Sequence, residues 1–157
     1  MEIWELVARE RIRDSLALYN WSGDAFRLSE LASAFCTEGT LEIRGRTPLR
    51  GRKAILDFLG TSMLSDEAHR AALQTRPASG ARRLVRHNVA NIRFLELSQK
   101  EALVASYFTV FTENGLDHYG RYRDTFVPVG DLWLIRHRYV STDWKAPEST
   151  MVSPSRS

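Results

Sequence analysis

The feature that most constrains the fold is a set of four strand-length segments between residues 84 and 144. Each is about 10 to 14 residues long, a length and spacing that predict an antiparallel meander. Turn-forming residues separate the segments at 98–100, 113–115 and 130–131. In the segment 103–111 both alternating faces are largely apolar, which indicates that both faces of the sheet are covered.

Apolar residues at helical spacing predict three helices before these strands. The helices are expected at 3–20, at 28–35 and, after Gly51, at 55–63, with a short strand at 40–44. This order predicts an α+β fold in which three N-terminal helices pack on a strongly curved, mainly antiparallel sheet and form a cone-like barrel with a hollow. Helices cover only one sheet face, so we expect a homodimer through the other face.

The chain of 157 residues is the size of one ordinary domain, which we place at 1–144. The end of the chain, 145–157, is rich in Pro, Ser and Thr and predicts a flexible tail. Residues 65–82 are polar and broken by turn formers, which predicts a long loop with a helical turn at 67–73 that could cover a site.

Composition excludes several classes of protein. Cys36 is the single cysteine, so an internal disulfide framework is excluded and a reducing cytoplasm is the expected location. No apolar run is long enough for a membrane span, and the N-terminus has no secretory pattern. The net charge of +3, from 22 basic and 19 acidic residues, gives little support to nucleic-acid binding.

Searches for phosphate-binding, dinucleotide-binding, nucleophile-elbow and zinc-protease motifs find none. The four histidines, His69, His87, His118 and His137, do not pair at metal-ligand spacing. We therefore expect neither a metal nor a cofactor, and any chemistry should be acid–base chemistry on an organic substrate.

Two polar stretches remain as candidate sites, residues 19–24 at the end of the first helix and 86–91 at the start of the first long strand. Together with residues 49–55, 120–124 and 131–133, their order along the chain resembles SnoaL-like members of the nuclear-transport-factor-2-like superfamily. The resemblance covers about residues 3–143. It implies the cone-like fold already expected from the pattern.

The closest likeness is to the branch that contains scytalone dehydratase, dehydrochlorinases and bile acid dehydratases. That resemblance implies an acid–base dyad of Asp24 and His87, with Tyr19 as a tyrosine of the pocket. A histidine, with an ordinary pKa of about 6.5, exchanges protons near neutral pH, and a carboxylate holds its ring. Candidate donors for an enolate are Tyr19, Asn91, Tyr107 and Tyr122.

The expected function is a cofactor-independent lyase or isomerase, dehydratase-like, that acts on a small hydrophobic carbonyl or cyclic compound. The superfamily also implies alternatives: a noncatalytic ligand-binding or subunit-assembly module, or a polyketide-cyclase-like ring closure. The second histidine of scytalone-dehydratase-like enzymes would fall near Thr112, which leaves the proton donor open.

Each candidate also has a structural interpretation. Asp24 could cap the second helix, and His87 could be a half-exposed strand residue. Strict alternation from His87 would place Asn91 on the hollow-facing side unless a bulge shifts the register. His118 and His137 are most simply structural, although either could face the pocket.

Overall fold

The structure, a computed structural model, describes residues 1–64 and 84–149. Three helices and six strands make up this part of the chain. The helices are α1 (Ile3–Asp24), α2 (Leu28–Ser33) and α3 (Arg52–Leu64). The strands are β1 (Phe35–Ile43), β2 (Leu49–Arg50), β3 (Val85–Leu97), β4 (Ala102–Thr112), β5 (Gly115–Val129) and β6 (Leu132–Lys145).

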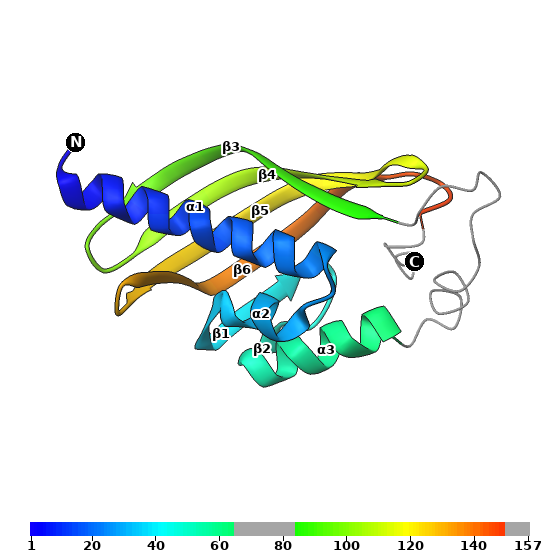
Figure 1. Cartoon of the computed structure of the whole chain (residues 1–157), viewed down its shortest axis with the longest axis horizontal. Coiled ribbons are helices and arrows are strands. Elements are labelled where there is room, and N and C mark those ends of the chain that lie inside the picture. Colours follow the sequence, from blue (N-terminus) through cyan, green and yellow to red (C-terminus); the bar gives the residue numbers. More distant parts are fainter. Residues whose placement is uncertain (65–83, 150–157) are drawn as a thin grey trace.

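The strands form a single six-stranded sheet in the order β2-β1-β6-β5-β4-β3. Only β1 and β6 pair in parallel, and the other neighbours are antiparallel. Helix α1 runs along one face of the curved sheet, and α2 and α3 lie next to β1 and β2 (Figure 1). The predicted cone-like α+β arrangement, with three helices on a mainly antiparallel sheet, is confirmed.

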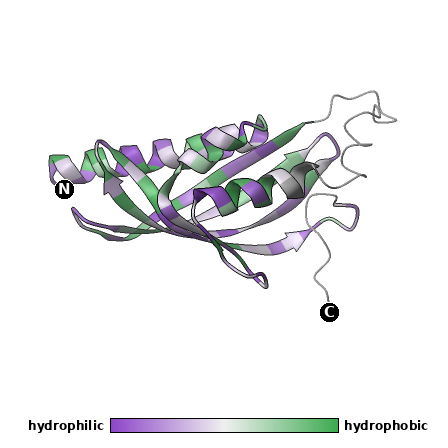
Figure 2. Ribbon diagram, turned by 90° about the horizontal axis from the view of Figure 1, so that it is seen from below, coloured by the Kyte–Doolittle hydropathy of each residue, from purple (hydrophilic) through white to green (hydrophobic). Residues whose placement is uncertain are grey.

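Alternating burial defines two faces of the sheet. In β4 the residues from Ala102 to Val110 with even numbers are buried, and we call this side the inner face. The odd-numbered residues point to the outer face and are partly or fully exposed. Figure 2, coloured by hydropathy, shows hydrophobic and hydrophilic residues interspersed along the helices and strands. The inner face meets α1, α2 and α3 in a core whose largest fully buried apolar side chains are Phe35, Phe126, Ile12, Leu16, Leu41, Ile55 and Ile135.

A β-bulge divides β3 into two halves. The pairing with β4 shifts between Ala90 and Arg93, and Asn91 between them has a φ of 51°, in the left-handed region. The extra residue turns Asn91 outward and lets Ile92 and Phe94 pack against the core. Strict alternation is therefore wrong beyond Ala90, because the bulge changes the face.

Helix α1 is held at both ends. The backbone N–H of Glu2 donates to Oε2 of Glu5 at 2.7 Å, which closes the first turn. The Arg9 guanidinium lies 4.4 Å from the ring centre of Phe94. The helix continues to Asp24, beyond the predicted end at 20, because Ser22 is buried and its hydroxyl donates to Glu30 of α2 at 3.2 Å.

Two other boundaries differ from the prediction. Helix α2 ends at Ser33, and Phe35 belongs to β1 instead of the helix, where its side chain is fully buried in the core. The first strand is therefore longer than the predicted 40–44. The predicted loop at 65–82, with its helical turn at 67–73 and His69, lies outside the described residues.

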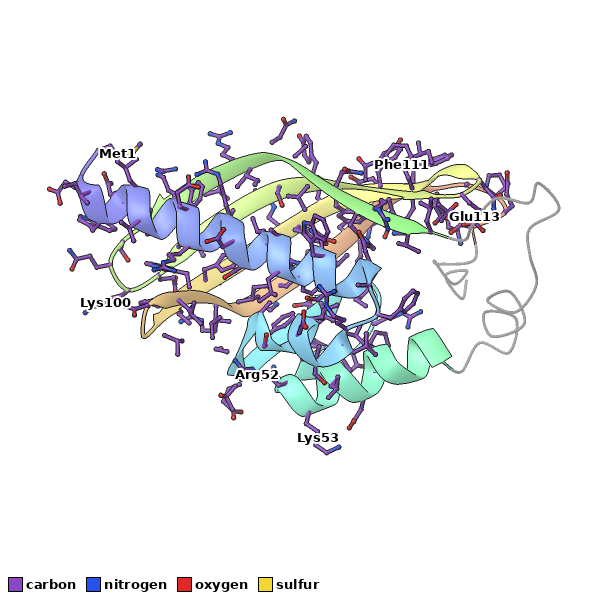
Figure 3. All side chains as sticks on the ribbon, viewed as in Figure 1. Met1, Arg52, Lys53, Lys100, Phe111 and Glu113 are labelled. Atoms are coloured by element: carbon purple, nitrogen blue, oxygen red, sulfur yellow. The ribbon has the colours of Figure 1, made fainter. Side chains whose placement is uncertain are left out.

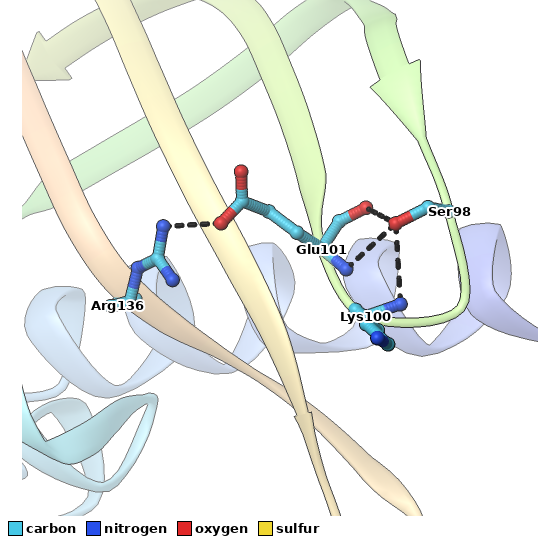
Figure 4. Close-up of polar contacts among 4 residues, drawn as sticks. All are labelled: Ser98, Lys100, Glu101 and Arg136. Carbon is cyan, nitrogen blue, oxygen red and sulfur yellow. Dashed lines mark hydrogen bonds and ion pairs between the residues drawn. The ribbon is translucent and has the colours of Figure 1, made fainter.

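The turn between β3 and β4 is closed by the Ser98 side chain (Figure 4). Its hydroxyl oxygen accepts from the backbone N–H groups of Lys100 at 3.2 Å and Glu101 at 3.1 Å. The Glu101 carboxylate reaches over to form an ion pair with Arg136 of β6. Lys100 marks this end of β4, and Phe111 and Glu113 mark the opposite end (Figure 3).

The start of the predicted flexible tail is anchored to β5. Strand β6 extends to Lys145, and the backbone N–H of Ala146 donates to the carbonyl of Asp117 at 2.7 Å. The hydroxyl of Ser149 donates to Asp117 Oδ2, also at 2.7 Å. These contacts bring residues 146–149 beside Asp117, and residues 150–157 lie outside the described part of the chain.

Gly120 of β5 is expected to be essential for sheet packing. A Cβ there would lie 2.0 Å from the carbonyl oxygen of Ser141 and 2.8 Å from Cζ of Phe108. We expect Gly120→Ala to lower the free energy of unfolding by about 1–3 kcal/mol, measured by urea denaturation. The control is Gly60→Ala in α3, where a Cβ meets nothing within 4 Å. Equal effects of the two substitutions would contradict the prediction.

Candidate active site

Asp24 and His87 are in direct contact on the inner side of the sheet edge. Asp24 is the last residue of α1, and His87 is near the start of β3. Nδ1 of His87 lies 2.6 Å from Asp24 Oδ1, and the backbone N–H of His87 donates to Oδ2 at 2.9 Å. With an ionised carboxylate, Nδ1 carries the ring proton and Nε2 keeps its lone pair for a proton from outside.

This geometry decides between the two interpretations of Asp24. The residue before α2 is Arg27, and no side chain caps that helix. Both carboxylate oxygens of Asp24 bind His87 instead. The side chain of Asp24 is 12% exposed and that of His87 is 20% exposed, so the pair is shielded but within reach of a molecule from solvent.

A second acid–histidine pair lies beside the first and comes from β5. Nδ1 of His118 is 2.7 Å from Oδ2 of Asp117, and both side chains are buried. The rings of His87 and His118 are 6.5 Å apart between centres and nearly perpendicular. The sheet aligns them, because His87 and His118 both pair with Val110 on the strand between them.

Thr112, near which the second histidine of scytalone-dehydratase-like enzymes was expected to fall, lies at the end of β4, where its hydroxyl oxygen accepts from the backbone N–H of Asn114 at 3.3 Å. The histidine that the structure brings next to His87 is His118, because the irregular register after Val110 places it opposite that residue. The sequence signal that could have found His118 is the pair Asp117-His118 just after the predicted turn at 113–115.

Burial sets the charge of His118. Loss of solvent lowers the pKa of His118 below its ordinary value, Asp117 opposes this effect, and the nearby His87 lowers the pKa further. Ser149 donates to the same carboxylate oxygen of Asp117 that binds the ring, so that carboxylate is oriented from two sides. His118 is therefore a fixed ring that favours the neutral form.

Tyr19 and Tyr122 enclose a buried ion pair further along the inner face. The Arg138 guanidinium carbon lies 4.2 Å from the ring centre of Tyr19 and 4.0 Å from that of Tyr122. Its Nε and Nη2 donate to the two oxygens of Asp124 at 2.8 and 2.7 Å, and neither side chain is exposed. Phe108 stacks on Tyr122 and also contacts His118, so an aromatic row joins the ion pair to the two histidines.

The electrostatics of this group follow from burial. Burial raises the pKa of Tyr122 and of Tyr19, although Arg138 opposes the shift at both rings, so both phenols stay neutral. Burial also opposes the charge of Arg138, but Asp124 keeps the pKa of the guanidinium above its ordinary value. Neither Arg138 nor Asp124 was predicted from the sequence as a site residue, because the pattern of the last strand places Arg138 among other basic residues on a strand face.

Two predicted donors do not face the interior. Tyr107 points to the outer face and is 53% exposed, because β4 alternates regularly and its even-numbered residues are the buried ones. Asn91 is exposed at the bulge of β3. His137 also lies on the outer side, where its Nε2 is 2.8 Å from Glu42 Oε2. The interior therefore holds Asp24, His87, Tyr19 and Tyr122 of the predicted set.

The described part of the chain contains neither a grouped metal site nor a membrane-spanning helix. Within residues 1–64 and 84–149, no three side chains of His, Cys, Asp or Glu are grouped so that they could hold a metal ion. No described helix has the length and apolar character needed to cross a membrane.

The fold is a small cone-like α+β domain that carries two acid–histidine pairs on its inner face. The chain belongs to the family described as the SnoaL-like domain, whose model matches residues 4–139. No curated protein matches the chain.

Solved structures with low sequence identity share the fold. A candidate scytalone dehydratase from Novosphingobium aromaticivorans has a TM-score of 0.70 and 22% identity, with 90% of this chain and 88% of that chain covered. An NTF2-like protein with a cystatin-like fold from the same species has a TM-score of 0.70 and 19% identity, with 94% and 88% covered. A protein from Catenulispora acidiphila, in complex with S-DNPA, has a TM-score of 0.68 and 20% identity, with 86% and 92% covered.

Acid should destabilise the fold through His118. Because its pKa is lowered in the folded chain, the unfolded chain takes up a proton first as the pH falls below about 6.5. We expect the free energy of unfolding to fall with pH in this range and to fall less steeply in His118→Gln, as measured by urea denaturation at a series of pH values. Gly60→Ala in α3, which changes no titratable group, is the control and should keep the wild-type slope. An unchanged slope in His118→Gln would refute this.

Proposed function

We propose that this protein is a cofactor-independent lyase or isomerase, dehydratase-like, in which His87 is the base and Asp24 orients it. The observation that carries the proposal is the two-point contact of the Asp24 carboxylate with His87, at 2.6 Å to Nδ1 and 2.9 Å to the backbone nitrogen. This contact holds the imidazole so that Nε2 is the atom that accepts a proton.

The proton steps use the described side chains. Nε2 of His87 takes a proton from a carbon next to a carbonyl, and the released electron pair forms an enolate. The Asp24 carboxylate stabilises the imidazolium. In an elimination the imidazolium gives the proton to the leaving hydroxyl oxygen, the carbon–oxygen bond breaks and water leaves. In an isomerisation the same proton returns to a different carbon.

His118 has a different part in this scheme. A protonated His118 next to the His87 imidazolium would bring two positive charges together, and burial disfavours that state. With Nδ1–H held by Asp117, the neutral ring offers Nε2 as an acceptor. We infer that His118 accepts a hydrogen bond from a substrate hydroxyl and so positions the leaving group.

Aromatic side chains on the inner face support the proposed substrate class. Phe108, Tyr122 and Tyr19 present aromatic surface beside the two histidines. This supports a small hydrophobic carbonyl or cyclic compound. The family and the structural likeness to a candidate scytalone dehydratase support a dehydration. A ring closure would start from the same enolate, and product analysis would reveal it as a cyclised product.

The dyad should be essential for proton abstraction. We expect the wild type to exchange the α-protons of a bound member of a β-hydroxy-ketone panel in deuterated water, measured by NMR, and to release the dehydrated or isomerised product. His87→Gln should lower this rate by about 10² to 10⁴, because the base is removed. Asp24→Asn should also lower it, since the amide cannot stabilise the imidazolium.

The control for this experiment is His137→Gln, which removes an acid-paired histidine from the outer face. It should leave exchange and turnover at the wild-type rate. Wild-type rates in His87→Gln would refute the catalytic role. Binding of panel members without any exchange in the wild type would indicate the noncatalytic ligand-binding function instead.

We also propose that the outer face forms a homodimer contact. Leu95, Tyr107, Phe111 and Tyr119 are all at least 41% exposed, and they come from the neighbouring strands β3, β4 and β5. The alternation of burial along these strands places these residues on the outer face of the sheet. A self-complementary contact would remove this apolar surface from water in both copies.

A charge on this face should separate the two copies. We expect Tyr107→Glu to shift the protein from dimer to monomer in sedimentation velocity, because the carboxylate would be desolvated in the interface. Leu6→Glu on α1, at a site 51% exposed, is the matched control and should leave the mass unchanged. A wild-type monomer at micromolar concentration would refute the dimer.

A further inference from the structure

The interior holds polar atoms that the fold leaves without hydrogen-bond partners. In the described part of the chain these include Nη1 of Arg138, Oγ of Ser106 and Oδ1 of Asn20. Their residues are only 0%, 3% and 6% exposed. An unpaired buried polar atom destabilises a folded chain, so three of them in one region need an explanation.

All three atoms belong to residues around the same pair of tyrosines. Asn20 follows Tyr19 in α1, and Ser106 is the cross-strand partner of Tyr122. Arg138 lies between the two rings. The three residues therefore come from α1, β4 and β6 around these tyrosines, and an aromatic row leads from Tyr122 through Phe108 to His118.

The hydrogen-bonding capacities of the three groups are complementary. Arg138 has an N–H left to donate after its other nitrogens bind Asp124, Ser106 can donate or accept, and Asn20 Oδ1 can only accept. Because Asp124 already neutralises the charge of Arg138, a neutral oxygen of a ligand fits these three residues better than a ligand carboxylate. A carbonyl oxygen meets this requirement, and its bond to the guanidinium strengthens as negative charge develops on it.

We propose that Arg138, Ser106 and Asn20 form a subsite for an oxygen function of the substrate, with Arg138 and Ser106 donating to a carbonyl oxygen and Asn20 accepting from a hydroxyl. This rests on the proposed function and narrows its substrate class to hydroxy-carbonyl compounds and their enols. It also supplies the enolate donors that the exposed Asn91 and Tyr107 cannot provide.

The subsite can be tested without turnover, using 2-naphthol as the probe and naphthalene as its apolar counterpart. Fluorescence titration should show that the wild type binds 2-naphthol about 10-fold or more tightly than naphthalene, since one hydroxyl then meets both donors and an acceptor. Bound 2-naphthol should also ionise at a lower pH than the free compound, because the guanidinium stabilises the naphtholate.

Ser106→Ala should weaken 2-naphthol binding about 5- to 10-fold and leave naphthalene binding unchanged, because only the hydroxyl of 2-naphthol would bind Ser106. The substitution should not lower the thermal stability, because the Ser106 hydroxyl has no partner in the folded chain. The matched control is Ser15→Ala, whose buried hydroxyl donates to the carbonyl of Trp133. That control should lower the melting temperature and keep the preference for 2-naphthol. Arg138→Lys, which keeps a cation beside Asp124 but removes the unpaired Nη1 N–H, should reduce the pH shift of the probe.

Equal affinity of the wild type for the two probes would overturn the subsite. So would a Ser106→Ala variant that keeps the full preference for 2-naphthol. The preference should survive in His87→Gln, which removes the proposed base alone. If the protein shows no preference for 2-naphthol but His87→Gln abolishes turnover, only the subsite is refuted. If the preference is present but His87→Gln keeps wild-type turnover, only the proposed function is refuted.

Discussion

The arrangement of the interior depends on the buried ion pair of Arg138 and Asp124. A guanidinium with no exposed surface is tolerated only when its charge is paired, and here Asp124 binds two of its nitrogens while the ring centres of Tyr19 and Tyr122 lie 4.2 and 4.0 Å from the guanidinium carbon. Tyr19 belongs to α1 and Tyr122 to the sheet, so the pair fixes the position of the helix on the sheet. The end of that helix then brings Asp24 to His87.

The two histidines meet because of irregularities in the strands. In a regular hairpin built on the turn after Thr112, Val110 would face Asp117, but the register shift after Val110 places His118 opposite it. Asp117 and His118 are consecutive and both buried, which a regular strand with alternating faces does not allow. The same irregularity thus supplies the second ring and the carboxylate that orients it.

Stability and function oppose each other in this interior. The unpaired atoms of Arg138, Ser106 and Asn20 weaken the folded chain, as does a histidine whose charged form is disfavoured by burial. Such departures from the packing of an ordinary core are expected where a site must bind a polar ligand. The apolar contacts of Phe35, Phe126 and Ile135 provide the compensating stability.

The sequence by itself determined the order of helices and strands and the turns of the meander, because hydrophobic period and turn residues can be read from short segments of the chain. The order of its motifs also indicated the family, and with it Asp24 and His87 as candidate site residues. Only the tertiary structure decided which side chains reach the interior. One inserted residue at Asn91 and one register shift at Val110 change the face of every residue that follows, and these shifts are fixed by pairing with the neighbouring strand. Arg138 entered the core, and Tyr107 was left outside, for the same reason: pairing across strands, more than residue type, sets the direction of a side chain.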